Sequence, residues 1–246
     1  MFKYFPHTPI DIEEMLKQIG VNSIEDLFKQ IDPSIRVQDL NIPFAHSESE
    51  LRKEIRRLGD KNKELISFLG AGSYDTFNFS VIDALASRQE FLTSYTPYQP
   101  EISQGTLQYI FEYQSMICEL TGMDVSNASM YDGATATTEA MFMAVSQSRK
   151  NKVLLSSTVN PNVIEVVKTY AKYRGITVEI IETQDYLTSY ADLEAKYDDE
   201  VGTIIESQPN FYGVIEDYSL INEFAKRNNI VFVMNSDPST LSVLKT

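Results

Sequence analysis

The chain has 246 residues, 43% of them apolar and 23% charged, which is enough to bury a sizeable core and is ordinary for a globular protein. Its net charge of −14 argues against non-specific nucleic-acid binding, because such binding needs lysine and arginine to neutralise phosphates. The single cysteine, Cys118, excludes an intrachain disulfide, so we expect a reducing, cytoplasmic location. No apolar run is long enough to span a membrane, and no membrane partner is expected.

The N-terminal segment and the histidines exclude further classes of function. The first residues, MFKYFPHTPIDIEEM, turn acidic without a long apolar run, so we expect no signal peptide. Only His7 and His46 are present, and both lie beside helix-start signals. We therefore interpret them as surface or capping residues and expect neither a histidine-built metal site nor a Ser–His–Asp triad.

The first part of the chain predicts short helices. Thr8–Pro9 is typical of a helix start, and Gly20 of a helix end. Ser47 and Glu50 have the spacing of a capping box in front of a strongly charged helix. We expect residues 1–66 to form an N-terminal helical arm that leans on another surface.

A polar, aromatic segment, SYTPYQPEISQGTLQ at residues 94–108, precedes a long amphipathic helix. Pro97 and Pro100 restrict its backbone, which lowers the entropy lost when the segment becomes ordered. The helix is expected to begin near Gly105 and to end at Gly122. Its apolar side chains form one stripe that we interpret as core packing: Leu107, Ile110, Phe111, Ile117 and Leu120.

The remainder of the chain alternates between strands and helices. The segments KVLLSS, ITVEII, GTIIES and IVFVM have the composition of buried strands. Helices are expected after Asn160-Pro161, in ADLEAKY and in EDYSLINEFAKRNN. Strands separated by single helices predict crossover connections and a parallel sheet that is covered on both faces. We also expect the C-terminal part of this domain to be missing, since the chain stops directly after a buried strand.

Three short motifs could carry chemistry. FLGAGSYD contains Gly-x-Gly without the third glycine of a dinucleotide site, so a tight turn or a close backbone approach is favoured. YDGAT could bind a phosphate at a helix N-terminus, but Asp132 could equally cap that helix and would repel a phosphate, and we favour the cap. Asp237 follows a strand where ligand-binding residues occur, or it begins an Asp-Pro-Ser-Thr turn.

Taken together, six segments resemble the family of glycine dehydrogenase (decarboxylating) subunit 1, the alpha subunit of the split P-protein of the glycine cleavage system. They are MFKYFPHTP, SFLGAGSYD, YTPYQPEISQGTLQ, FEYQSMICELTGMDVSNASMYDGAT, VVKTYA and QPNFYGVIED. The resemblance runs from Met1 to Asp217 and, more loosely, to Asp237.

The resemblance implies the α/β architecture of fold type I pyridoxal-phosphate (PLP) enzymes, with a partial large domain at residues 67–246. It implies an enzyme subunit that decarboxylates glycine with a partner, subunit 2, and passes the aminomethyl group to the lipoyl group of H-protein. In the family, subunit 2 carries PLP and the Schiff-base lysine, so this chain is expected to have no catalytic residue of its own, to bind no cofactor tightly and to be inactive alone.

The resemblance also implies two groups of site residues. The first forms a loop that completes the partner's active site, where substrate and subunits meet: Tyr95, Pro97, Tyr98, Gln99, Glu101 and Gln104. The second is a degenerate cofactor site: Gly133, Ala134, Thr135 and Asp237.

The chain departs from the family pattern at a few positions: Thr76, Phe77, Phe79, Asn160 and Ser242. These departures and the early end of the chain support an alternative, in which the chain is a truncated, non-catalytic remnant that acts only as a binding module.

Overall fold

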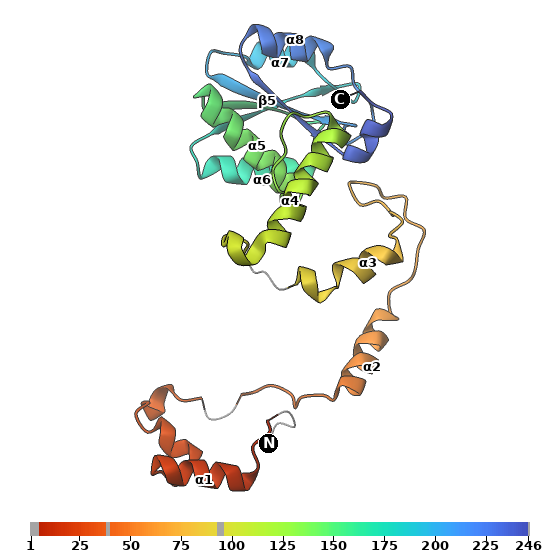
Figure 1. The fold of residues 1–246 in the computed structure, drawn as a ribbon. Helices are drawn as coiled ribbons and strands as arrows, with labels where there is room; N and C mark the ends of the chain where they lie inside the picture. Colours follow the sequence, from red (N-terminus) through yellow and green to blue (C-terminus); the bar gives the residue numbers. More distant parts are fainter. Residues whose placement is uncertain (1–4, 38–39, 93–95, 246) are drawn as a thin grey trace. The chain divides into compact units, whose positions relative to one another are not determined.

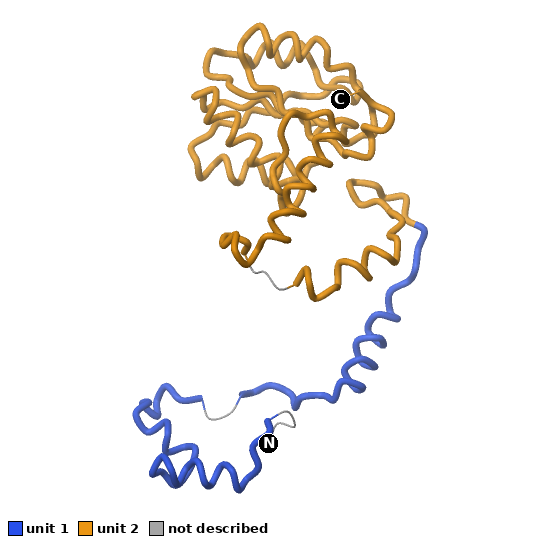
Figure 2. Tube along the Cα trace, viewed as in Figure 1, with its two compact units in different colours: residues 1–66 blue, residues 67–246 orange. Residues whose placement is uncertain are grey.

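The computed structural model describes residues 5–37, 40–92 and 96–245. The chain divides into two compact units, residues 1–66 and residues 67–246, which Figure 2 distinguishes by colour.

The first unit consists of short helices with side-chain caps. They are α1 (Pro9–Ile19), η1 (Ile24–Phe28), η2 (Pro33–Ile35) and α2 (Glu48–Gly59). The predicted helix signals are confirmed: Thr8 caps α1, Gly20 ends it in the left-handed conformation, and Ser47 forms a capping box with Glu50. None of the described residues of this unit is buried, so the described part has no hydrophobic core of its own.

The second unit begins with helices and continues into a sheet domain. The first elements are α3 (Ser80–Ala86), η3 (Gln89–Phe91), α4 (Pro100–Thr121) and α5 (Gly133–Ser148). There follow β1 (Lys152–Ser156), α6 (Pro161–Lys172), β2 (Thr177–Ile181), β3 (Thr183–Gln184), β4 (Leu187–Thr188) and α7 (Tyr190–Lys196). The last elements are β5 (Val201–Gln208), α8 (Ser219–Arg227), β6 (Val231–Ser236) and η4 (Pro238–Ser242).

The main sheet is parallel and lies between two helical layers. Its strand order is β2-β1-β5-β6, and every neighbouring pair is parallel. In Figure 1, α5 and α6 lie on one face and α7 and α8 on the other. The predicted strands and the predicted covering of both faces are confirmed, whereas the small β3–β4 hairpin, α3 and η3 were not predicted.

Two separate hydrophobic cores follow from the alternation of side chains along the strands. On β1, Leu154 packs into a core with α7 and α8, and the adjacent Leu155 packs into a core with α5 and α6. Both leucines are fully buried. Because the strands are parallel, the carboxyl ends of β1, β5 and β6 lie along one edge of the sheet. This is the edge at which a site can form.

Two expectations for α4 are wrong. The helix begins at Pro100, not at Gly105, and it is kinked at Ser103, where φ is −124° and ψ is 18°. The predicted core stripe is not buried in this chain, since Leu107, Phe111 and Leu120 are 37%, 67% and 70% exposed. The apolar periodicity of a helix indicates which of its sides is to be buried. It does not show whether the surface that buries this side belongs to the same chain.

Among the helices of the described residues, none combines the length and the apolarity that a crossing of a lipid bilayer requires.

Candidate functional site

The carboxyl ends of the parallel strands carry a cluster of polar side chains. Glu206 and Gln208 lie at the end of β5, Ser156 ends β1, and Ser236 ends β6. Ser236 Oγ donates a hydrogen bond of 2.9 Å to the carbonyl oxygen of Gln208. Ligands of open α/β sheets bind at this edge, so we take it as the candidate site.

Glu206 is the most unusual side chain of this edge because it is a fully buried carboxyl group. Thr188 Oγ1 donates a hydrogen bond of 2.8 Å to its Oε2, while its Oε1 has no partner among the described residues. Burial, together with the nearby charge of Glu216, raises the pKa of Glu206 to about 8. The carboxyl group is therefore protonated at neutral pH.

Glu216 ties the loop after β5 to the rest of the edge. Its carboxylate accepts hydrogen bonds from the Thr188 N–H at 2.8 Å and from Asn210 Nδ2 at 2.7 Å. Gln208 Nε2 donates to the carbonyl oxygen of Glu216 at 2.9 Å. The buried Tyr218 hydroxyl donates to the Ser207 carbonyl oxygen at 2.9 Å, and burial raises the pKa of this tyrosine well above its usual range. This network was not predicted, although Glu206, which directly follows the apolar residues of the strand segment GTIIES, was a usable signal.

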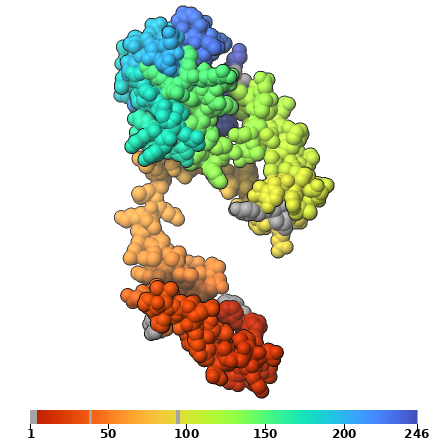
Figure 3. Space-filling model, turned by 90° about the vertical axis from the view of Figure 1, so that its left-hand side faces the viewer, coloured from red at the N-terminus to blue at the C-terminus, as the bar shows by residue number. Residues whose placement is uncertain are grey.

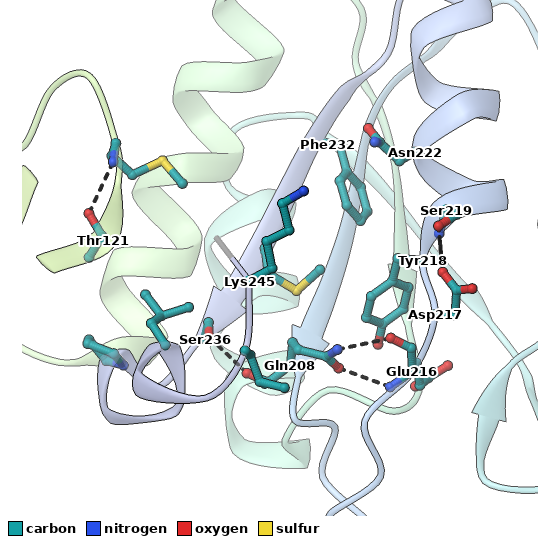
Figure 4. Close-up of a pocket in the computed structure, with 15 residues that line it drawn as sticks. Thr121, Gln208, Glu216, Asp217, Tyr218, Ser219, Asn222, Phe232, Ser236 and Lys245 are labelled. Atoms are coloured by element: carbon teal, nitrogen blue, oxygen red, sulfur yellow. Dashed lines mark hydrogen bonds between the residues drawn. The ribbon is translucent and has the colours of Figure 1, made fainter.

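A cavity of about 840 Å³ lies beside this network (Figure 4). One wall consists of Phe232 and Met234 on the edge strand β6, and the other of η4 and the following residues, with Leu241 and Lys245. Thr121 and Met123 close it from the end of α4. The cavity contains none of the predicted loop or cofactor residues.

The N-terminus of α5 is occupied by a side chain of its own. Thr135 donates its N–H to Asp132 Oδ1 at 2.7 Å and its hydroxyl to the same atom at 2.8 Å. These hydrogen bonds lower the pKa of Asp132, so the carboxylate is ionised and stands where a phosphate would bind. The predicted capping role of Asp132 is confirmed. Gly133, Ala134 and Thr135 consequently do not fit the phosphate of PLP in this structure.

Asp237 lies directly after β6 and makes local contacts. Asn235 Nδ2, at the end of β6, donates a hydrogen bond of 3.0 Å to Thr137 Oγ1 in α5, so the two predicted cofactor segments lie at the same edge. Asp237 Oδ1 accepts the N–H of Ser239 at 2.9 Å and thereby starts η4. This geometry matches the turn interpretation.

The predicted loop lies elsewhere, and its last two residues, Glu101 and Gln104, belong to the start of α4 and not to a loop. Tyr95 falls outside the described residues, Pro97 is half-buried, and the other predicted side chains are exposed: Tyr98, Gln99, Glu101 and Gln104. Figure 1 shows the start of α4 at the end of the helix that points away from the sheet. The structure therefore does not bring this loop to the N-terminus of α5 or to Asp237.

The glycine motif and the two histidines have structural roles or are exposed. Gly70, Ala71 and Gly72 have φ values of 66°, 56° and 87°, which confirms the tight turn. A Cβ atom on Gly72 would lie 3.1 Å from Asn160 Nδ2, and that amide also caps α6 through its Oδ1.

His7 and His46 are exposed immediately before two helix caps. In the described ranges, no three His, Cys, Asp or Glu side chains are grouped to hold a metal ion.

Comparison with known proteins gives a consistent result. The sequence matches the family described as Glycine cleavage system P-protein over residues 2–246. It is 50% identical over 248 residues to the probable glycine dehydrogenase (decarboxylating) subunit 1 of Geobacillus sp. (strain WCH70), and 47% identical to that of Bacillus cereus (strain ATCC 10987 / NRS 248). Both alignments cover 99% of this chain, which spans 55% and 56% of these relatives.

The fold agrees with these relatives. The crystal structure of glycine decarboxylase (P-protein) of the glycine cleavage system, in inhibitor-bound form, superposes with a TM-score of 0.87 at 39% identity, covering 99% of this chain and 55% of that one. Sphingosine-1-phosphate lyase from Burkholderia pseudomallei K96243 shares the fold alone, with a TM-score of 0.54 at 11% identity over 81% of this chain and 49% of that one. The predicted α/β fold class is thus confirmed, and the chain belongs to the glycine cleavage system P-protein family.

Proposed function

We propose that this chain functions as subunit 1 of a glycine dehydrogenase (decarboxylating), in which glycine is decarboxylated with PLP and the aminomethyl group passes to the lipoyl group of H-protein. The observation that carries the proposal is the 50% identity to a probable subunit 1 across 99% of the chain. Because such relatives are named as subunit 1 of the enzyme, we assign the activity to an assembly and not to this chain alone.

The geometry of the α5 N-terminus supports a division of labour between two subunits. Asp132 fills the position where a phosphate would bind, so we assign PLP and its Schiff-base lysine to subunit 2. This chain has the role of completing the partner's site with the loop that contains Tyr95, Tyr98 and Gln104. The exposure of the described part of that loop is compatible with a contact outside this chain. We place the assembly in the cytoplasm.

A reconstitution tests this function. The purified chain is mixed with subunit 2 and H-protein, and the glycine-dependent exchange of carbon dioxide is measured. We expect exchange only when both subunits are present. Exchange by subunit 2 and H-protein at the same rate without this chain contradicts the proposal.

The alternative is a binding module that holds subunit 2 without assisting the reaction. The departures from the family pattern at Thr76, Phe77 and Phe79 support this alternative. The exchange activity of Tyr98→Ala distinguishes the two functions. If the Tyr98→Ala chain supports full exchange, the binding module is favoured.

A further inference from the structure

Helix α4 carries apolar side chains on two of its sides. A helix that is covered on only one side needs one such row. Ile110 and Ile117 are half-buried on the side of the helix that includes Thr121. A second row, which we call the α4 stripe, has the helical spacing of four, three and four residues: Tyr109, Tyr113, Met116 and Leu120. These side chains are 40%, 41%, 59% and 70% exposed.

Within the described residues of the second unit, the α4 stripe has little cover. Phe91 of η3 meets the Tyr109 ring edge to face at a centroid distance of 5.7 Å, and Tyr109 nevertheless stays 40% exposed. Figure 3 shows α4, in yellow-green, standing out from the sheet. A helix that is apolar over so wide a sector is normally buried between two surfaces.

The accessible surface of the chain is larger than that of compact bodies of the same mass. It measures 19726 Å² for a chain of 28.0 kDa. Two separate compact bodies with the masses of residues 1–66 and 67–246 would together expose about 13,000 Å². The excess is spread over the chain and includes the first unit, in which no described residue is buried, and the α4 stripe is one exposed apolar part of it.

The charges beside the α4 stripe indicate the chemistry of that partner. From Gln89 to Ser148 the sequence contains no lysine, arginine or histidine, whereas it contains seven acids: Glu90, Glu101, Glu112, Glu119, Asp124, Asp132 and Glu139. Glu112 and Glu119 are exposed and share the helix surface that borders the stripe. A complementary surface is apolar with lysine or arginine at its rim.

The same charges disfavour a second copy of this chain as the occupant. A two-fold contact between copies would place each patch against itself, so acids would face acids. Like charges in close contact oppose association. The occupant is thus a different surface, and the relatives of this chain are named as subunit 1 of an enzyme that has more than one subunit.

We propose that the α4 stripe is the docking surface for subunit 2, which meets it with an apolar patch rimmed by lysine or arginine. This inference rests on the function proposed above. Docking along α4 also brings the predicted loop towards the partner, since that loop lies at the N-terminal end of the same helix, around and before the kink at Ser103.

The test measures binding and activity separately. Full-length wild-type chain, Met116→Arg and Glu119→Lys are titrated with purified subunit 2 by biolayer interferometry, and each mixture is assayed for carbon dioxide exchange. Met143→Arg is the matched control, because Met143 is 65% exposed on α5, outside the stripe. Circular dichroism and thermal unfolding establish that every variant folds.

We expect Met116→Arg to weaken binding about 30-fold or more, the effect of losing an interface hot spot, and Met143→Arg to bind within about threefold of wild type. Glu119→Lys should slow association and reduce its dependence on salt, even if Met116→Arg were to fold poorly. If Met116→Arg and Glu119→Lys both bind subunit 2 with wild-type affinity and give full exchange activity, the docking surface is overturned and the proposed function is left intact.

Two further outcomes also overturn the inference. If the wild-type chain does not bind subunit 2 and gives no exchange, the proposed function fails together with the docking surface. If light scattering shows that the chain alone is a dimer that Met116→Arg dissociates, the stripe belongs to a contact between copies.

Discussion

Thr188 joins two carboxyl groups, those of Glu206 and Glu216, at the carboxyl end of the sheet. Its hydroxyl donates a hydrogen bond of 2.8 Å to Glu206, and its N–H donates one of 2.8 Å to Glu216. Burial raises the pKa of Glu206 to about 8, so this group is neutral at pH 7. The edge of the sheet thus tolerates two adjacent carboxyl groups because one of them keeps its proton.

The protonation of Glu206 makes stability depend on pH. The pKa of Glu206 is about 8 in the folded chain and near its ordinary value of 4.5 in the unfolded chain. Between these values the folded state binds more protons, so the free energy of unfolding falls as pH rises, by at most about 5 kcal/mol. Glu206→Gln removes this titration, so urea unfolding at about pH 5 and about pH 9 should give a flatter dependence than wild type.

The control for this experiment is Glu139→Gln, an exposed glutamate on α5. It should follow the wild-type dependence on pH. Parallel curves for wild type and Glu206→Gln would contradict the assignment of a proton to Glu206.

Asp132 should stabilise α5 as a cap, independently of any cofactor. Asp132→Ala leaves the N–H of Thr135 without its acceptor and should lower the unfolding temperature, whereas Asp132→Ser supplies a new acceptor and should largely retain it. Because hydrogen bonds lower the pKa of Asp132, the difference between wild type and Asp132→Ala should shrink as the carboxylate is protonated at acid pH. Differential scanning fluorimetry measures both effects, and an Asp132→Ala chain as stable as wild type at neutral pH would count against the cap.

Tyr98 separates a catalytic contribution from simple binding. The side chain is 73% exposed, so Tyr98→Ala should leave the fold unchanged, and exchange is measured with subunit 2 in saturating excess so that a change in affinity does not alter the rate. If the loop helps to position glycine in the partner's site, carbon dioxide exchange should fall about 10- to 100-fold. Tyr173→Ala, at a 78% exposed position after α6, is the control and should retain full exchange.

Gly202 should be intolerant of any side chain. A Cβ atom there would lie 2.9 Å from Lys150 Cβ and 3.0 Å from Ser148 Cβ, and closer still to Ser148 Oγ. We expect Gly202→Ala to destabilise the chain by about 1–3 kcal/mol, as overpacking does, and Ser148→Ala to recover part of that loss.

Gly105→Ala is the matched control for Gly202→Ala, since no atom lies within 4 Å of the added Cβ and the residue lies inside α4. It should stabilise the helix by about 0.5–1 kcal/mol, because alanine loses less backbone entropy than glycine. Urea unfolding of the three variants distinguishes these outcomes, and equal stabilities would disprove the steric explanation.

Much of the fold was predictable because its signals are local. Thr8, Ser47 and Asp132 cap their helices with residues three positions away, and the strand segments alternate between two cores as the sheet requires. The site was less predictable. Glu206 depends on Thr188 and Glu216, which lie on other elements, and no short window of sequence contains all three.

The amino-acid sequence by itself determined the helix caps, the order of strands and helices and the segments that resemble the P-protein family. Only the tertiary structure decided that Glu206 is buried and protonated, that Asn235 brings the end of β6 to α5, and that the apolar face of α4 remains exposed. The physical reason is that caps and periodicity act over a few residues, whereas burial and pKa depend on neighbours that only folding brings together.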